Sequence, residues 1–258
     1  MLRRLSTFSI AGHCARTGQL GVAVSTADVG AGRLVTWARS GVGAVAVQSW
    51  PNLYGALDAL ERLEAGDDAE QALDAAIGGD PGRALRQMGV VDRRGRAASW
   101  TGEECTPWAG HITGDGFAAQ GNMLVGGETV AAMADTFAAR ADVDLAERLL
   151  VALEAGQAAG GDRRGRQCSA LYVVDREAFP LWDLRVDEHP EPVAELRRIY
   201  EIALEQLLPF VAGLPTRENP EGSLTEDFVR MNLLPPSQRQ AQTTERRSGR
   251  GHDPRSAS

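Results

Sequence analysis

Thr7 is the first residue of the first strand-like stretch of the chain, residues 7–11, and it directly follows residues 1–6. If the Ser6–Thr7 peptide bond is cleaved, one residue holds both a hydroxyl nucleophile and a free α-amine. The α-amino group has an ordinary pKa of about 7.7 to 8.0, so it can take the hydroxyl proton near neutral pH. Thr7 is therefore a candidate nucleophile, although an ordinary edge strand that begins here gives the same pattern.

The segment GGDRRGRQ at residues 160–167 contains three glycines and three arginines between a predicted helix and a predicted strand. Backbone N–H groups freed by glycine, together with guanidinium forks, suit a carboxylate or another anionic group. Asp162 is placed to hold one of the arginines. The alternative is a solvated loop with an Arg–Asp surface pair, and the spacing does not choose between them.

Gln120 and Asn122 flank Gly121 at the end of another strand-like stretch. Amide side chains in such a place either satisfy buried backbone groups or donate hydrogen bonds to a developing oxyanion. Local sequence favours the structural role and leaves the catalytic one open.

Residues 41–46, GVGAVA, are similar to the G-x-G-x-x-G/A fingerprint of nucleotide-binding sites. That fingerprint has to follow a strand and open a helix, whereas this segment begins a strand-like run. We therefore expect Gly43 to permit close sheet packing. A strand directly after Gly43 would exclude nucleotide binding at this segment.

Composition excludes several classes of function. The 258 residues are 43% hydrophobic, with a net charge of −8 and a pI near 5.1, so the broad basic field that non-specific nucleic-acid binding requires is absent. All 27 basic residues are arginine, so no lysine can act as a base, a Schiff-base former or a P-loop cation. We expect a small-molecule substrate rather than a nucleic acid.

Cysteines and histidines show no ligand spacing. Cys14, Cys105 and Cys168 are widely separated and odd in number, and the four histidines form no H-E-x-x-H pattern, so we expect neither a metal nor another cofactor. Apolar runs are far shorter than the ~20 residues that span a membrane. Residues 1–6 lack the apolar region of a secretory signal, which predicts a cytoplasmic protein.

Patterning along the chain predicts the elements that position these residues. Strand-like runs cover residues 5–14, 19–26, 41–49, 89–92, 97–100, 116–124, 168–175 and 180–186. Helical spacing covers residues 53–64, 69–77, 81–88, 128–140, 144–159, 192–208 and 224–232. This order does not alternate as βαβ units do, so we predict the α+β class, with two hairpin-fed sheets between helices in a four-layer αββα sandwich.

The predicted domain organisation has three parts: a leader at 1–6, one domain at 7–212, and a C-terminal extension at 213–258. From Pro235 onward the sequence has no periodicity and is rich in Arg, Gln and Ser, which predicts disorder. The long amphipathic helix at 192–208 offers a surface for self-association, so we expect a homo-oligomer.

Several of these motifs together resemble the DUF1028 family. The resemblance rests on TFSI at 7–10, GVAVS at 21–25, WAR at 37–39, GVGAVAVQS at 41–49, QGNML at 120–124 and GGDRRGRQ at 160–167. It extends over roughly residues 7–210. It implies an αββα fold like that of the N-terminal-nucleophile (Ntn) hydrolases, which cleave amide bonds with an N-terminal Thr, Ser or Cys.

The resemblance also implies roles for individual residues. The nucleophile maps to Thr7, and Asn122 or a backbone N–H is the candidate donor to the oxyanion. The expected substrate-binding residues are Ser25, Gln48, Asp162, Arg164, Arg166 and Gln167, with the arginine loop holding a substrate carboxylate. The leading hypothesis is therefore an amidohydrolase that cleaves a linear amide bond of a small, carboxylate-bearing substrate.

One departure from the family bears on this hypothesis. Family members commonly begin with Met directly before the Thr, whereas here five additional residues intervene. This departure leaves three possibilities. In the first, Thr7 attacks the Ser6 carbonyl in an autoproteolytic step, and in the second, translation starts later. In the third, Thr7 stays capped by the residues before it. In the last case the chain is a catalytically silent binding or assembly protein that keeps the fold.

Overall fold

The computed structural model describes residues 7–239 of the chain. The predicted leader at 1–6, and the part of the predicted disordered tail from 240 onward, lie outside the described residues. The described residues form two compact units, which meet in the sequence between Ile199 and Tyr200. The predicted domain boundary at residue 212 stays a prediction.

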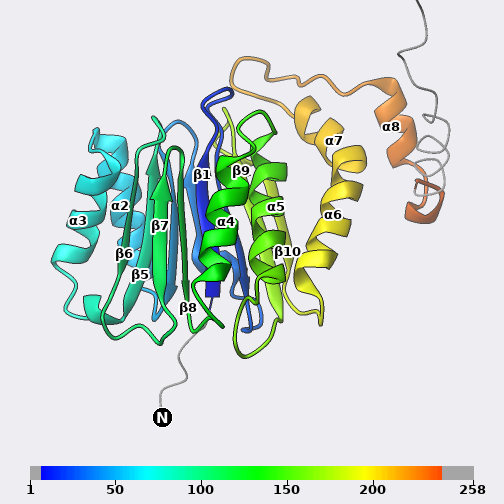
Figure 1. Ribbon diagram of the computed structural model, residues 1–258. Coiled ribbons are helices and arrows are strands. Elements are labelled where there is room, and N and C mark those ends of the chain that lie inside the picture. The colour runs from blue at the N-terminus through cyan, green and yellow to red at the C-terminus, as the bar shows by residue number, and fades with distance from the viewer. Residues whose placement is uncertain (1–6, 240–258) are drawn as a thin grey trace, which may run out of the picture. The chain divides into compact units, whose positions relative to one another are not determined.

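Ten strands form two antiparallel sheets within the described part of the first unit (Figure 1). The six-stranded sheet has the order β10-β9-β2-β1-β8-β7 and the four-stranded sheet the order β3-β4-β5-β6. The strands are β1 (Thr7–His13), β2 (Leu20–Thr26), β3 (Thr36–Arg39), β4 (Gly43–Ser49), β5 (Arg86–Asp92), β6 (Ala97–Thr101), β7 (Gly110–Gly114), β8 (Phe117–Asn122), β9 (Cys168–Val174) and β10 (Pro180–Val186).

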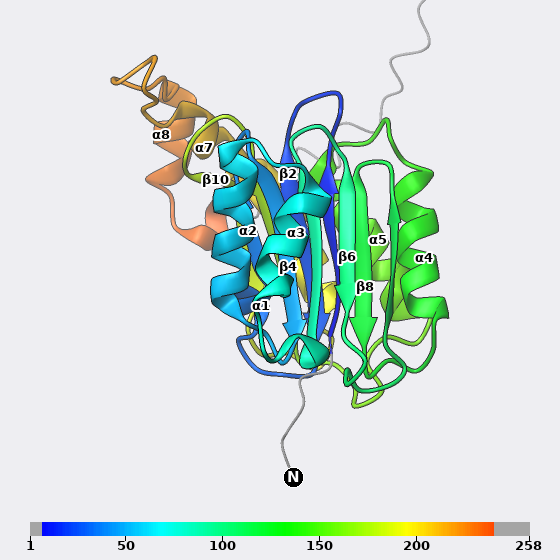
Figure 2. The same ribbon diagram turned by 90° about the vertical axis from the view of Figure 1, so that its left-hand side faces the viewer.

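Helices cover the outer face of each sheet. The helices are α1 (Gly32–Val35), α2 (Leu53–Ala65), α3 (Ala69–Gly78), α4 (Glu128–Ala138), α5 (Leu145–Ala158), α6 (Pro192–Gln206), α7 (Leu208–Gly213) and α8 (Glu226–Asn232). Figure 2 shows α2 and α3 against the four-stranded sheet, with α4 and α5 on the far side of the six-stranded sheet. The predicted α+β class is confirmed.

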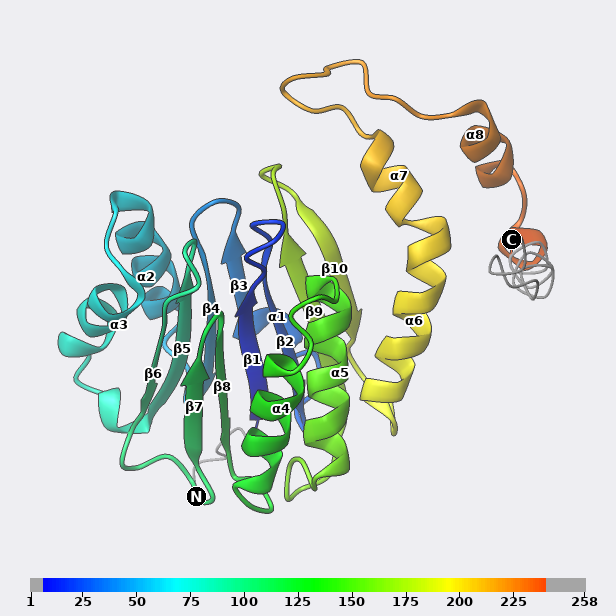
Figure 3. The same cartoon turned by 45° about the horizontal axis from the view of Figure 1, so that its top comes forward.

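Strand β1 lies in the middle of the six-stranded sheet (Figure 3). All seven residues of β1 and of β2 are buried, because one face of the sheet meets the second sheet and the other meets α4 and α5. The two strands form the predicted hairpin, in which Gly18 takes the positive φ of 78° that the turn requires. The start of β1 therefore lies between the ends of two other buried strands.

Close packing at Gly43 explains the glycines that are similar to a nucleotide fingerprint. A Cβ atom on Gly43 would lie 2.4 Å from Leu63 Cδ1 and 2.8 Å from the carbonyl oxygen of Val91. Gly43 begins strand β4, and no helix follows it. The packing role of Gly43 is confirmed, and the nucleotide-binding alternative is wrong.

The helix predicted at residues 81–88 is wrong. A single turn of 3₁₀ helix covers Arg83–Leu85, and strand β5 begins at Arg86. The Asp80–Pro81 start signal is local, whereas Gln87 and Met88 gain backbone hydrogen bonds by pairing with Gln48 and Val47 on β4. Sheet pairing therefore overrides the helical pattern of this segment.

Other differences concern short elements and element ends. Strands β3 and β7 and helix α1 were not predicted; each is four or five residues long. Strand β8 ends at Asn122, since Met123 adopts a positive φ of 55°. The long helix ends at Gln206 rather than 208, and α7 follows it. Residues 236–239, inside the predicted disordered tail, form a helical turn.

Two further observations bear on the composition-based expectations. Cys14, Cys105 and Cys168 lie within the described residues, where all three are buried and none forms a disulfide bond. No helix among residues 7–239 combines the length and the apolar character that a membrane crossing requires.

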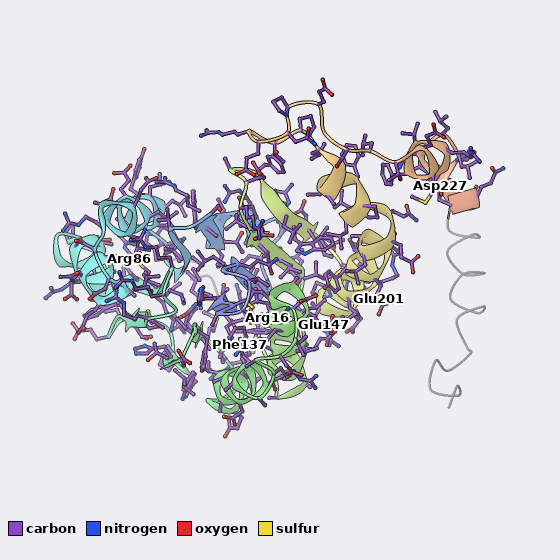
Figure 4. The ribbon with its side chains drawn as sticks, turned by 90° about the horizontal axis from the view of Figure 1, so that it is seen from above. Arg16, Arg86, Phe137, Glu147, Glu201 and Asp227 are labelled. Atoms are coloured by element: carbon purple, nitrogen blue, oxygen red, sulfur yellow. The ribbon has the colours of Figure 1, made fainter. Side chains whose placement is uncertain are left out.

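A buried ion pair fixes the junction of α2, α3 and β5. Asp80 accepts hydrogen bonds from Arg86 Nε at 2.9 Å, from Asn52 Nδ2 at 3.0 Å and from the backbone N–H of Gly82 at 2.7 Å. Arg86, labelled in Figure 4, lies on the α2 and α3 side of the molecule. The Arg86 hydrogen bond is the main reason why the pKa of Asp80 falls from 3.8 to about 2.

We predict that Asp80→Asn lowers the free energy of unfolding at pH 7 by about 3 kcal/mol, because the partly buried Arg86 then loses its charged partner. The folded pKa of Asp80 is depressed, so the pair contributes its stability above pH 3.8 and loses it as the pH falls through about 2. The difference between wild type and variant should therefore shrink by about 2 kcal/mol across that range.

Urea unfolding at several pH values between 7 and 2 measures this difference. Asp144→Asn is the matched control, because the Asp144–Arg16 pair is exposed and should contribute little. If the difference in the free energy of unfolding between wild type and Asp80→Asn stays constant with pH, the ion pair of Asp80 with Arg86 is not the source of that stability.

Candidate active site

Thr7 lies at the start of β1, opposite Thr26 on β2 and opposite Asn122 on β8. Its side chain is buried, with 2% of the residue exposed. Thr7 Oγ1 donates to Thr26 Oγ1 at 3.2 Å, and Thr26 Oγ1 donates to Asp28 Oδ2 at 3.3 Å. Both distances are long for O–H···O hydrogen bonds, so the contacts orient the hydroxyls more than they stabilise the fold. A chain of two hydrogen bonds therefore leads from the Thr7 hydroxyl through Thr26 to the carboxylate of Asp28, and we call it the route from Thr7.

Arg164 connects this route to the 160–167 loop. Its Nη2 atom lies 2.7 Å from Asp28 Oδ2 and 3.1 Å from Asp162 Oδ2. Burial lowers the pKa of Arg164, but the hydrogen bonds to Asp28 and Asp162 outweigh it and leave that pKa raised. The guanidinium therefore stays charged and holds two carboxylates together near Thr26.

Asp162 is the buried anchor of the loop, with 1% of its side chain exposed. It accepts hydrogen bonds from the backbone N–H groups of Ala27 at 3.0 Å and Arg164 at 2.8 Å. Gly160, Gly161 and Gly165 have φ values of 126°, 62° and 110°, which non-glycine residues rarely adopt. The three glycines thus allow the loop to bend around Asp162.

Amide side chains occupy the space between the two sheets beneath Thr7. Gln48 Nε2 donates to the carbonyl oxygen of Thr7 at 3.1 Å and to Gln87 Oε1 at 2.8 Å. Asn122 Nδ2 also donates to Gln87 Oε1, at 3.0 Å, and Ser9 Oγ donates to Gln48 Oε1 at 2.6 Å. The side chains of these five residues, Thr7, Ser9, Gln48, Gln87 and Asn122, are all buried. The structural role that local sequence favoured for the Asn122 amide is therefore present.

The structure brings together five of the eight predicted site residues: Thr7, Gln48, Asn122, Asp162 and Arg164. The other three lie elsewhere. Ser25 pairs with Phe8 and so faces the α4 and α5 layer, on the opposite side of the sheet from Thr7. Its Oγ atom has no hydrogen-bond partner among the described residues.

Arg166 and Gln167 follow Arg164, the loop residue whose side chain contacts Asp28. Arg166 forms an ion pair with Glu191 at 2.5 Å, beside the start of α6. Gln167 contributes backbone contacts: its N–H donates to the carbonyl oxygen of Thr26, and its carbonyl oxygen accepts from His189. Their expected roles in substrate binding stay predictions.

Sequence reasoning missed Thr26, Asp28 and Gln87. The hairpin register contained the signal for Thr26, since a tight turn at residues 14–19 places it directly opposite Thr7. Asp28 follows two residues later, just past the strand end. Gln87 gave no signal, because it lies in the segment that was interpreted as a helix.

Among residues 7–239, no group of three or more His, Cys, Asp or Glu side chains is arranged to hold a metal ion. The described polar groups near Thr7 are hydroxyls, carboxylates, amides and one guanidinium. Such groups can orient a nucleophile, accept its proton and donate to an oxyanion.

Comparison with known proteins places the chain in a family. Residues 7–196 match the model of the "Family of unknown function (DUF1028)". The chain belongs to the DUF1028 family. The match begins at Thr7 and includes Thr26, Asp28, Gln87 and the side chains described above that contact them.

A solved DUF1028 structure has the same fold. The crystal structure of protein SPO2555 from Silicibacter pomeroyi is 32% identical and superposes with a TM-score of 0.78, covering 86% of this chain and 96% of that one. Anbu (ancestral beta-subunit) from Yersinia bercovieri is 12% identical, with a TM-score of 0.35 and coverage of 81% and 98%. No curated protein matches the sequence.

We predict that Asp162→Ala loosens the loop of this DUF1028 protein. In this variant the backbone N–H groups of Ala27 and Arg164 lose their acceptor, and the Arg164 guanidinium loses one of its two carboxylate partners. The free energy of unfolding should therefore fall by about 2 kcal/mol. Amide hydrogen exchange at Ala27 and Arg164 should become faster by about tenfold or more.

Asp183→Ala is the matched control, because the Asp183–Arg185 pair is a longer contact on the surface. Unchanged protection of the Ala27 and Arg164 amides in Asp162→Ala would show that Asp162 does not anchor the loop.

Proposed function

We propose that this DUF1028 protein is an N-terminal-nucleophile amidohydrolase with Thr7 as its nucleophile. The observation that supports this most directly is the hydrogen-bonded route from the buried Thr7 hydroxyl through Thr26 to Asp28. The arrangement of helices, two sheets and helices, with Thr7 first on a central strand, agrees with the αββα architecture of Ntn hydrolases. The proposed substrate is a small molecule with a linear amide bond.

The proposed reaction requires cleavage of the Ser6–Thr7 bond, because only then is the α-amine of Thr7 free. Thr7 Oγ attacks the amide carbonyl while the α-amine takes the hydroxyl proton. That proton passes to the departing amine, and the acyl group remains on Thr7 as an ester. Water then hydrolyses the ester, releases the carboxylic acid and restores the Thr7 hydroxyl.

The described side chains around Thr7 have separate roles in this reaction. Thr26 orients the hydroxyl, and Asp28 accepts from Thr26. Asn122 lies beside Thr7 on the neighbouring strand, where its amide can donate to the oxyanion of the tetrahedral intermediate. The proposal gives the Asn122 amide the catalytic role that local sequence left open, in addition to the structural role that it favoured.

Arg164 needs a revised role within this proposal. Both carboxylates that it contacts belong to the protein, and its Nε, Nη1 and Nη2 atoms all donate to them. A substrate carboxylate would have to compete with Asp28 or Asp162 for these donors. We therefore assign Arg164 to holding the loop against Thr26 and leave the preference for a carboxylate-bearing substrate to the substrate screen below.

We expect the active species to begin at Thr7, and Thr7→Ala to abolish amide hydrolysis, because the variant has no nucleophile. Intact-mass analysis identifies the first residue, and a panel of N-acyl amino acids and small amides, with and without a carboxylate, measures turnover. Thr17→Ala, in the exposed β1–β2 turn, is the matched control and should keep full activity.

Two outcomes contradict the proposal. One is turnover by a preparation that retains residues 1–6. The other is equal turnover, or none, in wild type and Thr7→Ala, which favours the catalytically silent binding protein.

We predict that Thr26→Val lowers the rate constant kcat about tenfold with little change in KM, since the isosteric side chain removes the partner that orients the nucleophile. Steady-state kinetics on the best amide of the panel measures both constants. Thr36→Val is the control, because this buried threonine donates to the carbonyl oxygen of Gly32 and not toward Thr7. Equal kcat values in wild type and Thr26→Val would remove Thr26 from the reaction.

A further inference from the structure

Gln87 connects the two sheets directly beneath Thr7. It lies on β5 of the four-stranded sheet and only 1% of it is exposed. The two hydrogens of its Nε2 atom are shared among three acceptors, Gly121 O at 2.8 Å, Thr101 Oγ1 at 2.9 Å and Gly110 O at 3.1 Å. Gly110 and Gly121 belong to β7 and β8 of the six-stranded sheet, so one side chain joins three strands to its own.

The orientation of the Gln87 amide is forced. Backbone carbonyl oxygens only accept hydrogen bonds, so the NH₂ end of Gln87 has to face Gly110 and Gly121. The Oε1 end then points the other way, where it accepts from Gln48 Nε2 at 2.8 Å and from Asn122 Nδ2 at 3.0 Å. The geometry leaves no second arrangement that satisfies both ends.

This fixed acceptor in turn sets the orientation of the two amides beside Thr7. Gln48 presents its NH₂ end to Gln87 and also to the carbonyl oxygen of Thr7, so these two acceptors together fix its orientation. Asn122 also has to present its NH₂ end to Gln87. An amide that rotates by 180° exchanges a donor for an acceptor, and an acceptor beside a developing oxyanion would repel it.

We infer that Gln87 is a positioning residue: it fixes the donor ends of Gln48 and Asn122 next to Thr7. The inference rests on the proposed role of Thr7 as nucleophile. Gln87 acts through the two amides and does not itself touch the reacting atoms. If its contribution is only to hold the sheets together, its loss lowers stability and leaves the reactivity of each folded Thr7 unchanged.

Acylation of Thr7 by a β-lactone tests this inference without knowledge of the natural substrate. The hydroxyl opens the lactone ring, the acyl carbon becomes an ester on Oγ, and the ring oxygen leaves as a new hydroxyl group. Mass spectrometry counts the labelled sites and locates the ester. The rate constant per labelled site, measured well below the unfolding temperature, separates reactivity from the folded fraction.

We predict that Gln87→Leu reduces this rate constant by about a hundredfold, because Asn122 and Gln48 lose the acceptor that orients them. Gln71→Ala is the matched control. Gln71 completes the capping box of α3 with Asp68, so its loss also removes glutamine hydrogen bonds and some stability, but away from Thr7. The control should acylate at the wild-type rate.

Gln87→Glu provides a second variant if Gln87→Leu does not fold. The carboxylate can still accept from Gln48 and Asn122, but it cannot donate to Gly110 and Gly121, so the acceptor is no longer held in one place. The protonated acid can donate once and so can hold it again. The ratio of the variant rate constant to the wild-type rate constant should therefore rise as the pH falls. A purely structural role predicts a ratio that does not vary with pH.

The outcomes distinguish this inference from the proposed function. If wild-type protein is acylated at Thr7 and the Gln87 variants react within twofold of wild type per labelled site, the positioning role is overturned and the nucleophile stands. If wild-type protein is not acylated, or if Thr7→Ala is labelled equally, the proposed function fails, and the positioning role of Gln87 fails with it.

Discussion

The amide of Gln87 is the contact on which the arrangement around Thr7 depends. The two sheets pack through small apolar side chains, and such contacts are not directional, so they do not by themselves fix how the strand ends of one sheet align with those of the other. A buried amide can be satisfied only by partners in fixed places, and an unsatisfied one costs about 1 to 3 kcal/mol. Gln87 has these partners on both sheets, so the same hydrogen bonds that hold the sheets together also hold the amides beneath Thr7.

A second cluster holds Thr7 from the outer side. Asp162 and Asp28 share the guanidinium of Arg164, and Asp28 accepts from Thr26, which accepts from Thr7. The loop at 160–167 is thereby tied to the end of β2 although more than 130 residues separate them in the sequence. The amides and the ion pairs approach Thr7 from different directions, so the position of its hydroxyl depends on parts of the chain that fold together only in the complete sheet pair.

Much of the fold followed from local patterns. The β1–β2 hairpin, helices α2, α4 and α5, and the strands β9 and β10 were predicted to within two residues, because each has strong periodicity and clear end signals. The short strands β3 and β7 lack such a pattern, since most residues of β7 are exposed at a sheet edge. Residues 86–88 were misassigned for a different reason, because the hydrogen bonds that make them a strand come from β4, 39 residues earlier in the chain.

The sequence by itself determined that Thr7 lies near the start of a hairpin, that glycines surround Asp162, and that amides occur where β4 and β8 end. It determined these points because turn residues, periodicity and residue types act over a few positions. Only the tertiary structure decided which side chains meet. In a strand, neighbouring residues face opposite sides, so Thr26 joins Thr7 while Ser25, one residue earlier, faces the helices. The role of Gln87 depends on strands that lie far from it in the sequence, because the hydrogen-bond partners of a buried amide are set by how the two sheets pack.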